Sequence, residues 1–229
     1  MQPTPSKCVW VVIAAYNEID VIGRVVVDVK RRGHSVLLVD DGSTDATAAM
    51  AEKAGALVIR HPVNLGQGAA LQTGIEFALQ KGADVIVTFD ADGQHRVADI
   101  ENLIGALVEH EVDFALGSRA LGGAVNLPPT RRILLKAATW FTCLTSGLSV
   151  TDTHNGLRAM TQNGAQAIQL RQNRMAHASE FLNQVSASGL KYIEVPVTID
   201  YSAYSLAKGQ KLDNSLSILI DLSARSLHR

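Results

Sequence analysis

The feature that most constrains the fold of this 229-residue chain is an alternation of short apolar runs with amphipathic helical patterns in its first half. The apolar runs are rich in β-branched residues and too short for buried helices, so they predict strands. The predicted strands cover residues 9–14, 35–39, 56–60, 85–89 and 114–117. The helical patterns cover residues 18–32, 43–55, 66–82 and 97–110. This alternation predicts an α/β fold with a mostly parallel sheet and helices on both faces.

The second half of the sequence is less regular. Residues 122–129 are rich in Gly and Pro and predict a mobile loop over a site. A strand is predicted at residues 191–199, where Pro196 indicates a sheet edge or a bulge. The predicted helices cover residues 130–146, 163–172, 176–189 and 214–227, and the last of these is amphipathic. Since no repeat or linker interrupts these patterns, residues 1–229 are predicted to form a single domain.

Composition and charge exclude several classes of protein. The net charge of −1 and the lack of a long basic run argue against a nucleic-acid partner. Two cysteines suit a reducing compartment. The N-terminus lacks a signal-peptide core, and the longest apolar candidate, residues 133–150, contains Lys136 and several Ser and Thr residues. We therefore expect an amphipathic or half-buried helix there, in a cytoplasmic protein that is soluble or peripheral to a membrane.

Polar segments follow each of the five predicted strands in the first half. They cover residues 15–18, 40–43, 64–68, 90–95 and 117–119. In an open parallel sheet the carboxyl ends of the strands lie along one rim, and ligands bind there. A dinucleotide-binding loop is a weak alternative, because Gly66 and Gly68 follow the third strand and a third glycine is lacking. These two glycines instead suit close helix packing and approach of the backbone to a ligand.

Two carboxylates on this rim predict a metal site. Asp90 and Asp92 flank one residue directly after a buried strand, and Asp40 and Asp41 end a neighbouring strand. Carboxylate oxygens are hard ligands that suit Mg²⁺ or Mn²⁺, and a partly hydrated ion of this kind also binds substrate phosphates. Alone, the Asp-Ala-Asp sequence indicates no more than a polar turn, but the second acidic pair favours a metal and diphosphate site.

The ordered motifs resemble those of family 2 glycosyltransferases with the GT-A (Rossmann-like) fold, and most closely the dolichol- and polyprenyl-phosphate sugar synthases. They are Ala14-Ala15-Tyr16-Asn17-Glu18, Val39-Asp40-Asp41-Gly42-Ser43-Thr44-Asp45, Asn64-Leu65-Gly66-Gln67-Gly68-Ala69 and Asp90-Ala91-Asp92-Gly93-Gln94-His95. Gly117-Ser118-Arg119, Asp152, Gly156-Leu157-Arg158, Glu180 and Glu194-Val195-Pro196-Val197 follow in order, so the resemblance covers nearly the whole chain.

The resemblance implies a role for each matching position. The positions implied to bind a UDP- or GDP-sugar donor are Ala15, Tyr16, Glu18, Asp41, Gly66, Gln67, Asp90, Ala91 and Lys208. Those implied to hold Mg²⁺ or Mn²⁺ are Asp90, Asp92 and Gln94, and those implied to receive the acceptor's phosphate are Arg119 and Arg131. Residues 1–120 are thus expected to form the nucleotide-binding half and residues 121–229 the acceptor-binding half.

The chain departs from the family pattern at two places. Gln67 stands where members often carry Lys. The late Arg-x-x-Gly-x-Ser-Lys segment corresponds to residues 202–208, of which only the lysine is kept. Members of the lipid-phosphate branch often carry C-terminal transmembrane helices, whereas here the final helix, with Leu216 and Ile220 near Arg225, is expected to lie on a bilayer, on the domain's own sheet or on a small membrane-protein partner.

The implied reaction is an inverting displacement at the anomeric carbon of the sugar, for cell-envelope glycan synthesis. A polyprenyl phosphate acceptor is already anionic and needs only cations such as Arg119 and Arg131 to position it. A sugar-hydroxyl acceptor would need a base, for which Glu180 comes first and Asp152 second; His95 and His154 are further residues that could face the site. The alternatives are transfer to a sugar hydroxyl, a nucleotidyltransferase, or a silent nucleotide-sugar binder.

Overall fold

A computed structural model describes residues 7–172, 176–201 and 204 of the chain. The strands are β1 (Val9–Ala15), β2 (Ser35–Asp40), β3 (Leu57–Arg60), β4 (Val85–Asp90), β5 (Phe114–Val125), β6 (Arg158–Thr161) and β7 (Tyr192–Asp200). The helices are α1 (Ile19–Lys30), α2 (Thr47–Lys53), α3 (Gln67–Gln80), α4 (Ala98–Glu109), α5 (Pro129–Ser146), α6 (Gln162–Gln166) and α7 (Ala176–Ser188). Each strand predicted in the first half is confirmed, to within a few residues at its ends except for the longer β5.

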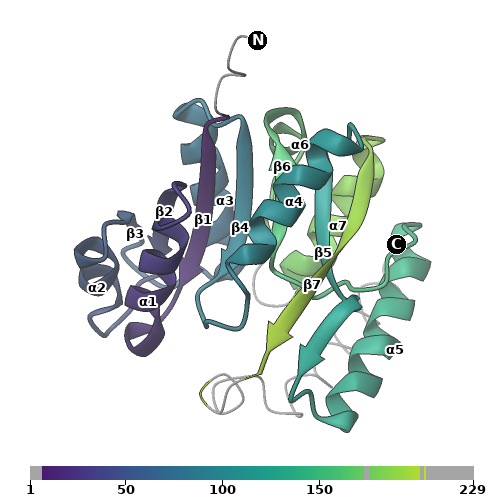
Figure 1. The fold of residues 1–229 in the computed structure, drawn as a ribbon, viewed down its shortest axis with the longest axis horizontal. Helices are drawn as coiled ribbons and strands as arrows, with labels where there is room; N and C mark the ends of the chain where they lie inside the picture. Colours follow the sequence, from purple (N-terminus) through teal and green to yellow (C-terminus); the bar gives the residue numbers. More distant parts are fainter. Residues whose placement is uncertain (1–6, 173–175, 202–203, 205–229) are drawn as a thin grey trace.

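The strands form one sheet in the order β3-β2-β1-β4-β6-β5-β7 (Figure 1). All neighbouring pairs are parallel except those of β6, which runs antiparallel to both β4 and β5. All strands other than β6 therefore end at the same edge of the sheet. This arrangement confirms the predicted α/β fold with a mostly parallel sheet in a single domain.

Helices cover both faces of the sheet, as the uniformly apolar strands predict. On one face, Val11 and Ile13 of β1 pack with Ile22 of α1 and with Ile100 and Leu103 of α4. On the other face, Val12 and Leu37 pack with Ile75 of α3 and with Phe181 and Leu182 of α7. Alternate residues of one strand thus enter different cores, because successive side chains of a strand point to opposite faces.

The structure corrects the prediction of a loop at residues 122–129. Gly123, Ala124 and Val125 continue β5, where they pair with Thr198, Ile199 and Asp200 of β7 after a register shift. A Cβ atom at Gly122 would overlap the backbone of Val197, so the glycines here permit a close approach of two strands. Pro196 pairs with Ser118 at the last position before the shift, on the edge strand, which confirms its predicted place.

The predicted helix at residues 163–172 is also wrong in extent. Helix α6 ends at Gln166. Beyond it, the backbone N–H of Leu170 donates to the Gln72 side chain at 2.8 Å, and that of Gln172 donates to Glu180, also at 2.8 Å. These side-chain acceptors on α3 and α7 replace the carbonyls that a longer helix would supply. The four-residue strand β6 was not predicted at all, because Arg158 opens it and it is too short to show a period.

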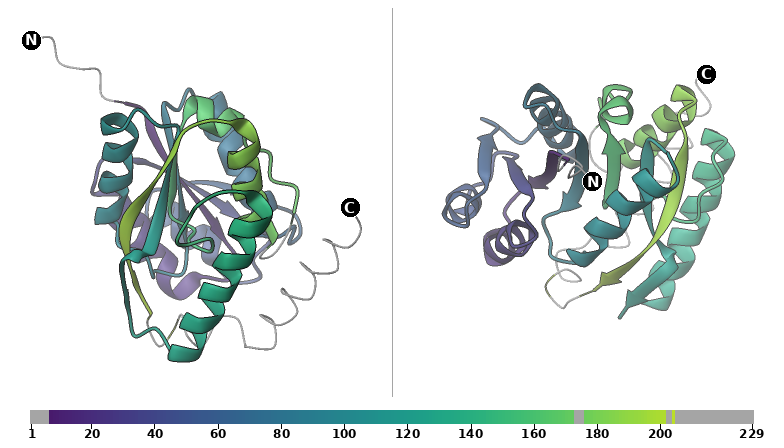
Figure 2. Two further views of the ribbon diagram at one scale, coloured as in Figure 1. Left: turned by 90° about the vertical axis from the view of Figure 1, so that its right-hand side faces the viewer. Right: turned by 45° about the horizontal axis from the view of Figure 1, so that its top comes forward.

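The amphipathic helix expected within residues 133–150 is confirmed as α5, which lies on the outside of the molecule (Figure 2). No helix among the described residues combines the length and the apolar character needed to cross a bilayer. The predicted helix at residues 214–227 and the predicted donor-binding Lys208 lie outside the described residues.

Candidate active site

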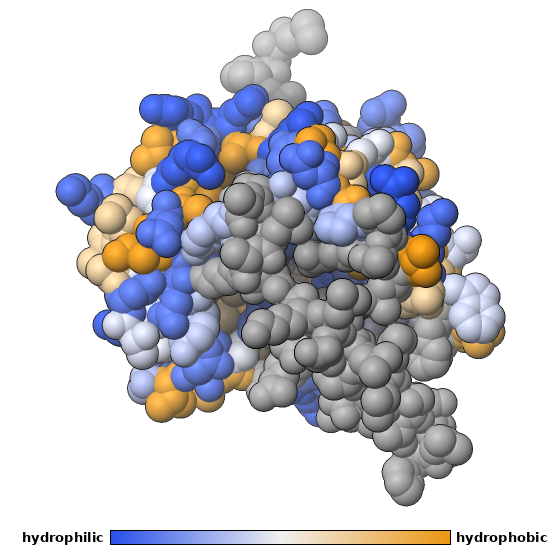
Figure 3. Space-filling view, turned by 90° about the horizontal axis from the view of Figure 1, so that it is seen from below, coloured by the Kyte–Doolittle hydropathy of each residue, from blue (hydrophilic) through white to orange (hydrophobic). Residues whose placement is uncertain are grey.

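The carboxyl ends of the parallel strands form the predicted rim, and they bring the residues predicted to bind the donor and the metal close together. Ala14 of β1 pairs with Asp90 at the end of β4, and Ala15 pairs with Asp40 at the end of β2. The segments that follow these three strands are therefore neighbours. Figure 3 views the molecule from this side, where the described residues expose a mixture of hydrophilic and hydrophobic surface.

Asp41 is buried and shapes the rim through its carboxylate. Its Oδ1 accepts the backbone N–H of Leu65 at 2.9 Å, and its Oδ2 accepts that of Gly66 at 2.7 Å. The ring Nδ1 of His61 lies 2.8 Å from the same Oδ1. Asp41 therefore holds the loop that leads into α3, and Gly66 is held at φ 97°, a conformation that glycine adopts without strain.

The predicted base and ribose residues follow β1. Tyr16 is exposed, whereas Ala15 is buried and its carbonyl accepts the backbone N–H of Asp41 at 2.8 Å. Glu18 contacts a residue far away in the sequence, because the hydroxyl of Tyr204 donates to its Oε2 at 2.8 Å. The chain that follows β7 thus returns to the end of β1.

Asp90 is held in place from three sides. Gln67 Nε2 donates to its Oδ1 at 3.2 Å, and His95 Nε2 lies 2.8 Å from its Oδ2. A Cβ atom at Gly156 would overlap both carboxylate oxygens, so the carboxylate packs flat on that glycine. Burial opposes ionisation of Asp90, but the hydrogen bond and charge of His95, followed by the charge of Arg158, leave its pKa below the ordinary value.

The pKa of Asp92 is shifted in the opposite direction. Burial and, after it, the nearby charge of Asp90 raise the pKa of Asp92 to about 6. Its Oδ1 accepts the backbone N–H of Gln94 at 3.1 Å, and no Lys or Arg among the described residues forms an ion pair with it. A cation placed between Asp90 and Asp92 would remove this repulsion.

Asp90 and Asp92 fit a divalent ion whose remaining ligands come from substrate and water. The described part of the chain contains no group of three or more His, Cys, Asp or Glu side chains that could enclose a metal. Mg²⁺ and Mn²⁺ sites of this type often use only one or two carboxylates, with waters and phosphate oxygens as the other ligands. The repulsion between Asp90 and Asp92 and the hard oxygen donors both suit such an ion, whereas Gln94 contacts the described residues through its backbone.

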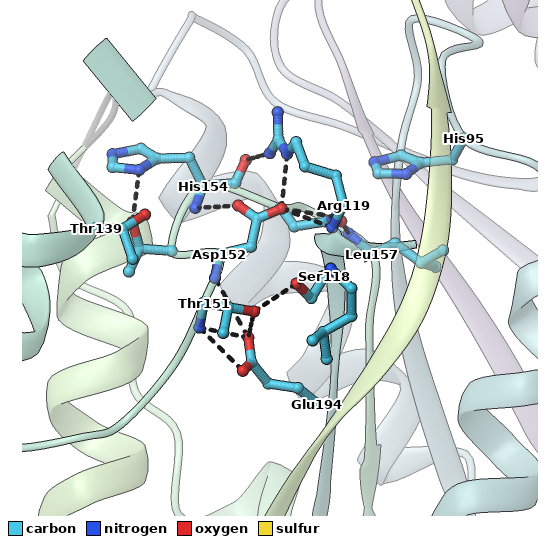
Figure 4. A network of polar contacts seen from close by, with 12 residues as sticks. His95, Ser118, Arg119, Thr139, Thr151, Asp152, His154, Leu157 and Glu194 are labelled. Atoms are coloured by element: carbon cyan, nitrogen blue, oxygen red, sulfur yellow. Dashed lines mark hydrogen bonds and ion pairs between the residues drawn. The ribbon is translucent and has the colours of Figure 1, made fainter. Parts of the chain in front are cut away.

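Arg119 forms a second polar cluster beside the rim (Figure 4). Its Nε donates to Asp152 Oδ2 at 2.6 Å, its NH1 to the Tyr201 hydroxyl at 2.7 Å and its NH2 to the His154 carbonyl at 2.7 Å. Burial acts to lower the pKa of Arg119, but Asp152 and Tyr201 outweigh it and raise the pKa. Arg119 is therefore a fixed cation, with the remaining N–H groups of its guanidinium available for a further acceptor.

A pocket of about 360 Å³ opens next to this cluster. Its cations are Arg119, Arg132 and Lys136, and its apolar side chains include Leu127 and Leu135. The pocket lies between the second half of β5 and α5. Positive charge beside an apolar wall suits a ligand that carries both a phosphate and a hydrocarbon chain.

The remaining predicted residues are placed as follows. Arg131 lies in the first turn of α5, and its side chain is outside the described part of the structure. Glu180, the first candidate base, accepts the backbone N–H groups of Arg171 and Gln172 through Oε2. Asp152, the second candidate, accepts from Arg119. Both candidate bases are thus engaged in holding the protein together.

Sequence reasoning missed several residues that support the site. Arg158 is fully buried near both Asp90 and Asp152, and burial lowers its pKa to about 10, so it stays charged at neutral pH. Its guanidinium stacks 4.3 Å from the Phe181 ring. Tyr201 and His177 complete this inner layer. The only sequence signal was the Gly156-Leu157-Arg158 motif, to which we assigned no role.

Comparison with known proteins identifies the family. The family model described as glycosyl transferase family 2 matches residues 10–165. The chain belongs to this family. It is 32% identical over 226 residues to the UDP-N-acetylglucosamine–dolichyl-phosphate N-acetylglucosaminyltransferase of Methanococcus voltae, covering 89% of this chain and 90% of that protein. It is 30% identical over 220 residues to the polyprenol monophosphomannose synthase of Mycolicibacterium smegmatis, covering 89% and 82%.

The structure of this family 2 glycosyltransferase also has solved counterparts. It resembles Mycobacterium tuberculosis glucosyl-3-phosphoglycerate synthase in complex with Mn²⁺, uridine diphosphate and phosphoglyceric acid. The TM-score is 0.73 at 19% identity, over 96% of this chain and 78% of that one.

An uncharacterized protein of Methanocaldococcus jannaschii is a further sequence relative. It is 37% identical over 219 residues, covering 93% of this chain and 90% of that protein. The predicted GT-A fold and the predicted glycosyltransferase family are both confirmed.

Proposed function

We propose that this protein transfers a sugar from a UDP- or GDP-sugar to polyprenyl phosphate at the cytoplasmic face of a membrane, in a reaction that needs Mg²⁺ or Mn²⁺. The observation that carries this proposal is the pocket lined by Arg119, Arg132 and Lys136 together with apolar side chains beside the donor rim. Relatives whose names specify dolichyl phosphate or a polyprenol phosphate product support the same acceptor class.

The donor is proposed to bind across the ends of β1, β2 and β4. Tyr16 and Glu18 are proposed to hold the base and the ribose, and Asp41 fixes the Gly66 loop, which is proposed to approach the donor. Ala91 lies between the two carboxylates with its side chain buried in the core, and its backbone is proposed to approach the diphosphate. Lys208 is proposed to approach the diphosphate from the segment after β7. Residues 1–120 would thus supply most donor contacts, and residues 121–229 most acceptor contacts.

A divalent ion held by Asp90 and Asp92 would neutralise the charge that develops on the leaving nucleoside diphosphate. In the proposed step, an oxygen of the acceptor phosphate forms a bond to the anomeric carbon while the bond from that carbon to the diphosphate oxygen breaks. Arg119, with Arg132, Lys136 and Arg131 on α5, would orient the acceptor phosphate. Its oxygen is already anionic, so no protein group has to remove a proton.

The engagement of both candidate bases favours phosphate over a sugar hydroxyl as acceptor. Asp152 is bound to Arg119 at 2.6 Å, and Glu180 accepts two backbone N–H groups. A base that must take a proton needs a lone pair directed at the substrate. Taking up a proton would weaken the bonds that either carboxylate now accepts, which counts against the acid–base route.

Nucleotide release tests the proposal. The protein is incubated with UDP- and GDP-sugars and Mg²⁺ or Mn²⁺, with polyprenyl phosphate, with a sugar-hydroxyl acceptor, or with neither. We expect release that depends on both metal and polyprenyl phosphate and that is lost in Asp92→Asn. Asp28→Asn, on the exposed face of α1, is the matched control. Release only with the hydroxyl acceptor would contradict polyprenyl phosphate as the acceptor. No release with any donor would contradict the proposed transferase activity.

A further inference from the structure

Helix α5 presents an apolar stripe to the outside of the molecule. Ile133, Trp140 and Leu144 are 71%, 69% and 70% exposed, although side chains of this size are usually buried. With the exposed Ala137 they follow the spacing of one helix face, so they lie within an arc of about 60° at 3.6 residues per turn. Figure 2 shows α5 as an outer element of the fold.

The charged residues of α5 itself all have the same sign. The sequence of α5 contains three basic residues, Arg131, Arg132 and Lys136, and no Asp or Glu. Arg132 and Lys136 are exposed and also line the pocket, so they lie between the stripe and the pocket. An apolar stripe with Trp, flanked by cations, is the pattern of a helix that lies in the interface of a membrane with anionic lipids.

We propose that the α5 stripe, defined as Ile133, Ala137, Trp140 and Leu144, docks the protein on an anionic lipid surface, with the pocket opening toward the lipid headgroups. This inference rests on the proposed function, because a lipid-phosphate acceptor would enter the pocket from that surface. It concerns α5 itself and does not depend on the C-terminal residues 205–229.

Charge argues against two other occupants of the stripe. A second copy of the chain would bring the same cations of α5 against one another. Residues 205–229 contain four Lys or Arg and two Asp, so this segment is also net basic and does not complement α5. An anionic surface is the occupant that satisfies both the apolar stripe and the cations at its edge.

Vesicle binding by the full chain tests the proposal. The variant Ile133→Ser/Trp140→Ser/Leu144→Ser is compared with the control Leu57→Ser/Val63→Ser/Val108→Ser, which removes exposed apolar side chains from other parts of the fold. Sedimentation uses phosphatidylcholine vesicles with and without phosphatidylglycerol. We expect the wild type and the control to bind the anionic vesicles, and the α5 variant to bind at least about tenfold more weakly.

Trp140 supplies a direct reporter. The chain has two tryptophans, so Trp10→Phe leaves Trp140 as the only one. Anionic vesicles that carry brominated acyl chains are expected to quench its fluorescence. The proposal would be overturned if the α5 variant bound vesicles as well as the wild type, or if Trp140 were not quenched. It would also be overturned if the wild type formed a dimer and the α5 variant a monomer.

Turnover separates this inference from the proposed function. With a short-chain, water-soluble polyprenyl phosphate, the α5 variant is expected to match the wild type, because none of the three side chains lines the pocket. With the acceptor embedded in vesicles, its rate is expected to fall at least about tenfold. A wild type that binds vesicles but transfers sugar to neither acceptor would contradict the proposed function and leave membrane docking intact.

Discussion

Asp90 and Asp92 are two positions apart in the sequence, but the protein shifts the pKa values of their carboxylates in opposite directions. Asp90 is fixed by Gln67, His95 and the flat surface of Gly156, and its pKa is lowered. Asp92 lacks such partners among the described side chains, and its pKa is raised to about 6. The ionised form of the first carboxylate is thus stabilised, whereas that of the second is destabilised, as a carboxylate awaiting a cation would be. Functional sites commonly contain groups whose ionised state the fold itself disfavours.

Asp92→Asn is expected to stabilise the metal-free protein at neutral pH while abolishing turnover. Because the folded-state pKa of Asp92 lies above 3.8, the folded protein binds this proton more tightly, and stability is lost as pH rises through about 6. The gain in free energy of unfolding is at most about 3 kcal/mol. Thermal unfolding with and without Mn²⁺ measures it, and Mn²⁺ should stabilise the wild type less well below pH 6. A variant less stable than the wild type at neutral pH would contradict this account.

Gly156→Ala is expected to damage the metal site more than the fold. The added Cβ would overlap both oxygens of Asp90, so the carboxylate must move away from Gln67 and His95. We expect turnover to fall at least about tenfold and stability to fall by about 1–3 kcal/mol. Titration with Mn²⁺, followed by nucleotide release and by thermal shift, measures both effects.

Gly105→Ala is the matched control for that change. Gly105 lies inside α4, and a Cβ there meets no atom within 4 Å. Replacing an exposed helical glycine by alanine is expected to stabilise the protein by about 0.5–1 kcal/mol and to leave turnover unchanged. Wild-type metal affinity in Gly156→Ala would rule out the positioning of Asp90 by this glycine.

At the scale of elements, β7 connects the two sides of the site. Its last residues pair with the second half of β5 beyond the bulge, and Asp200 N–H donates to the Gln94 carbonyl at 2.9 Å. Arg96 forms an ion pair with Asp200 at 2.8 Å. Tyr201 then reaches Arg119, and Tyr204 reaches Glu18. The end of β7 and the residues after it therefore contact the loop that follows Asp92, the proposed acceptor cation and the proposed donor residue.

Tyr201→Phe is expected to impair the acceptor side of the reaction. Arg119 would lose one of the three acceptors that orient its guanidinium, and a hydrogen bond to a charged group contributes about 1.5–3 kcal/mol. We expect the KM for polyprenyl phosphate to rise about tenfold and the KM for the donor to stay unchanged, in steady-state kinetics. Tyr192→Phe, at the start of β7 and bonded to Ser149, is the control. An equal change in both KM values would contradict a specific role of Tyr201 on the acceptor side.

At the scale of the whole molecule, one continuous sheet unites the expected donor and acceptor halves. Strand β6 lies between β4 and β5, and both cores contain residues from either side of position 120. Leu157, Ala159 and Val197 complete one core, and Met160 and Phe181 complete the other. The two halves are therefore not separate folding units.

The full chain is expected to unfold in a single cooperative transition, and a fragment of residues 1–120 is expected not to fold. Without β6 the fragment would expose the edge of β4, and it would lack the apolar side chains that cover both faces of the sheet. Near- and far-ultraviolet circular dichroism on heating tests both expectations. Two separated transitions in the full chain, or a protease-resistant fragment, would show that the halves fold independently.

The sequence by itself determined the α/β class, the first five strands and the rim on which the acidic motifs lie. Local information sufficed there, because each strand is a short apolar run between clear helix patterns and because parallel strands place their carboxyl ends at one edge. The same reasoning located Asp90, Asp92 and Arg119. The metal role predicted for Asp90 and Asp92 came from this rim, whereas the role of Arg119 was implied by the resemblance.

Only the tertiary structure decided the features that depend on distant partners. Strand β6 exists because β4 and β5 supply its hydrogen bonds, and the chain beyond α6 leaves the helix where Gln72 and Glu180 accept the backbone N–H groups of residues 170–172. The surroundings of Asp90, Asp92 and Arg119 likewise come from Gly156, Arg158 and Tyr201, far along the chain. The exposure of the α5 stripe is also a tertiary result, because an amphipathic pattern predicts an apolar face but not whether the fold covers it.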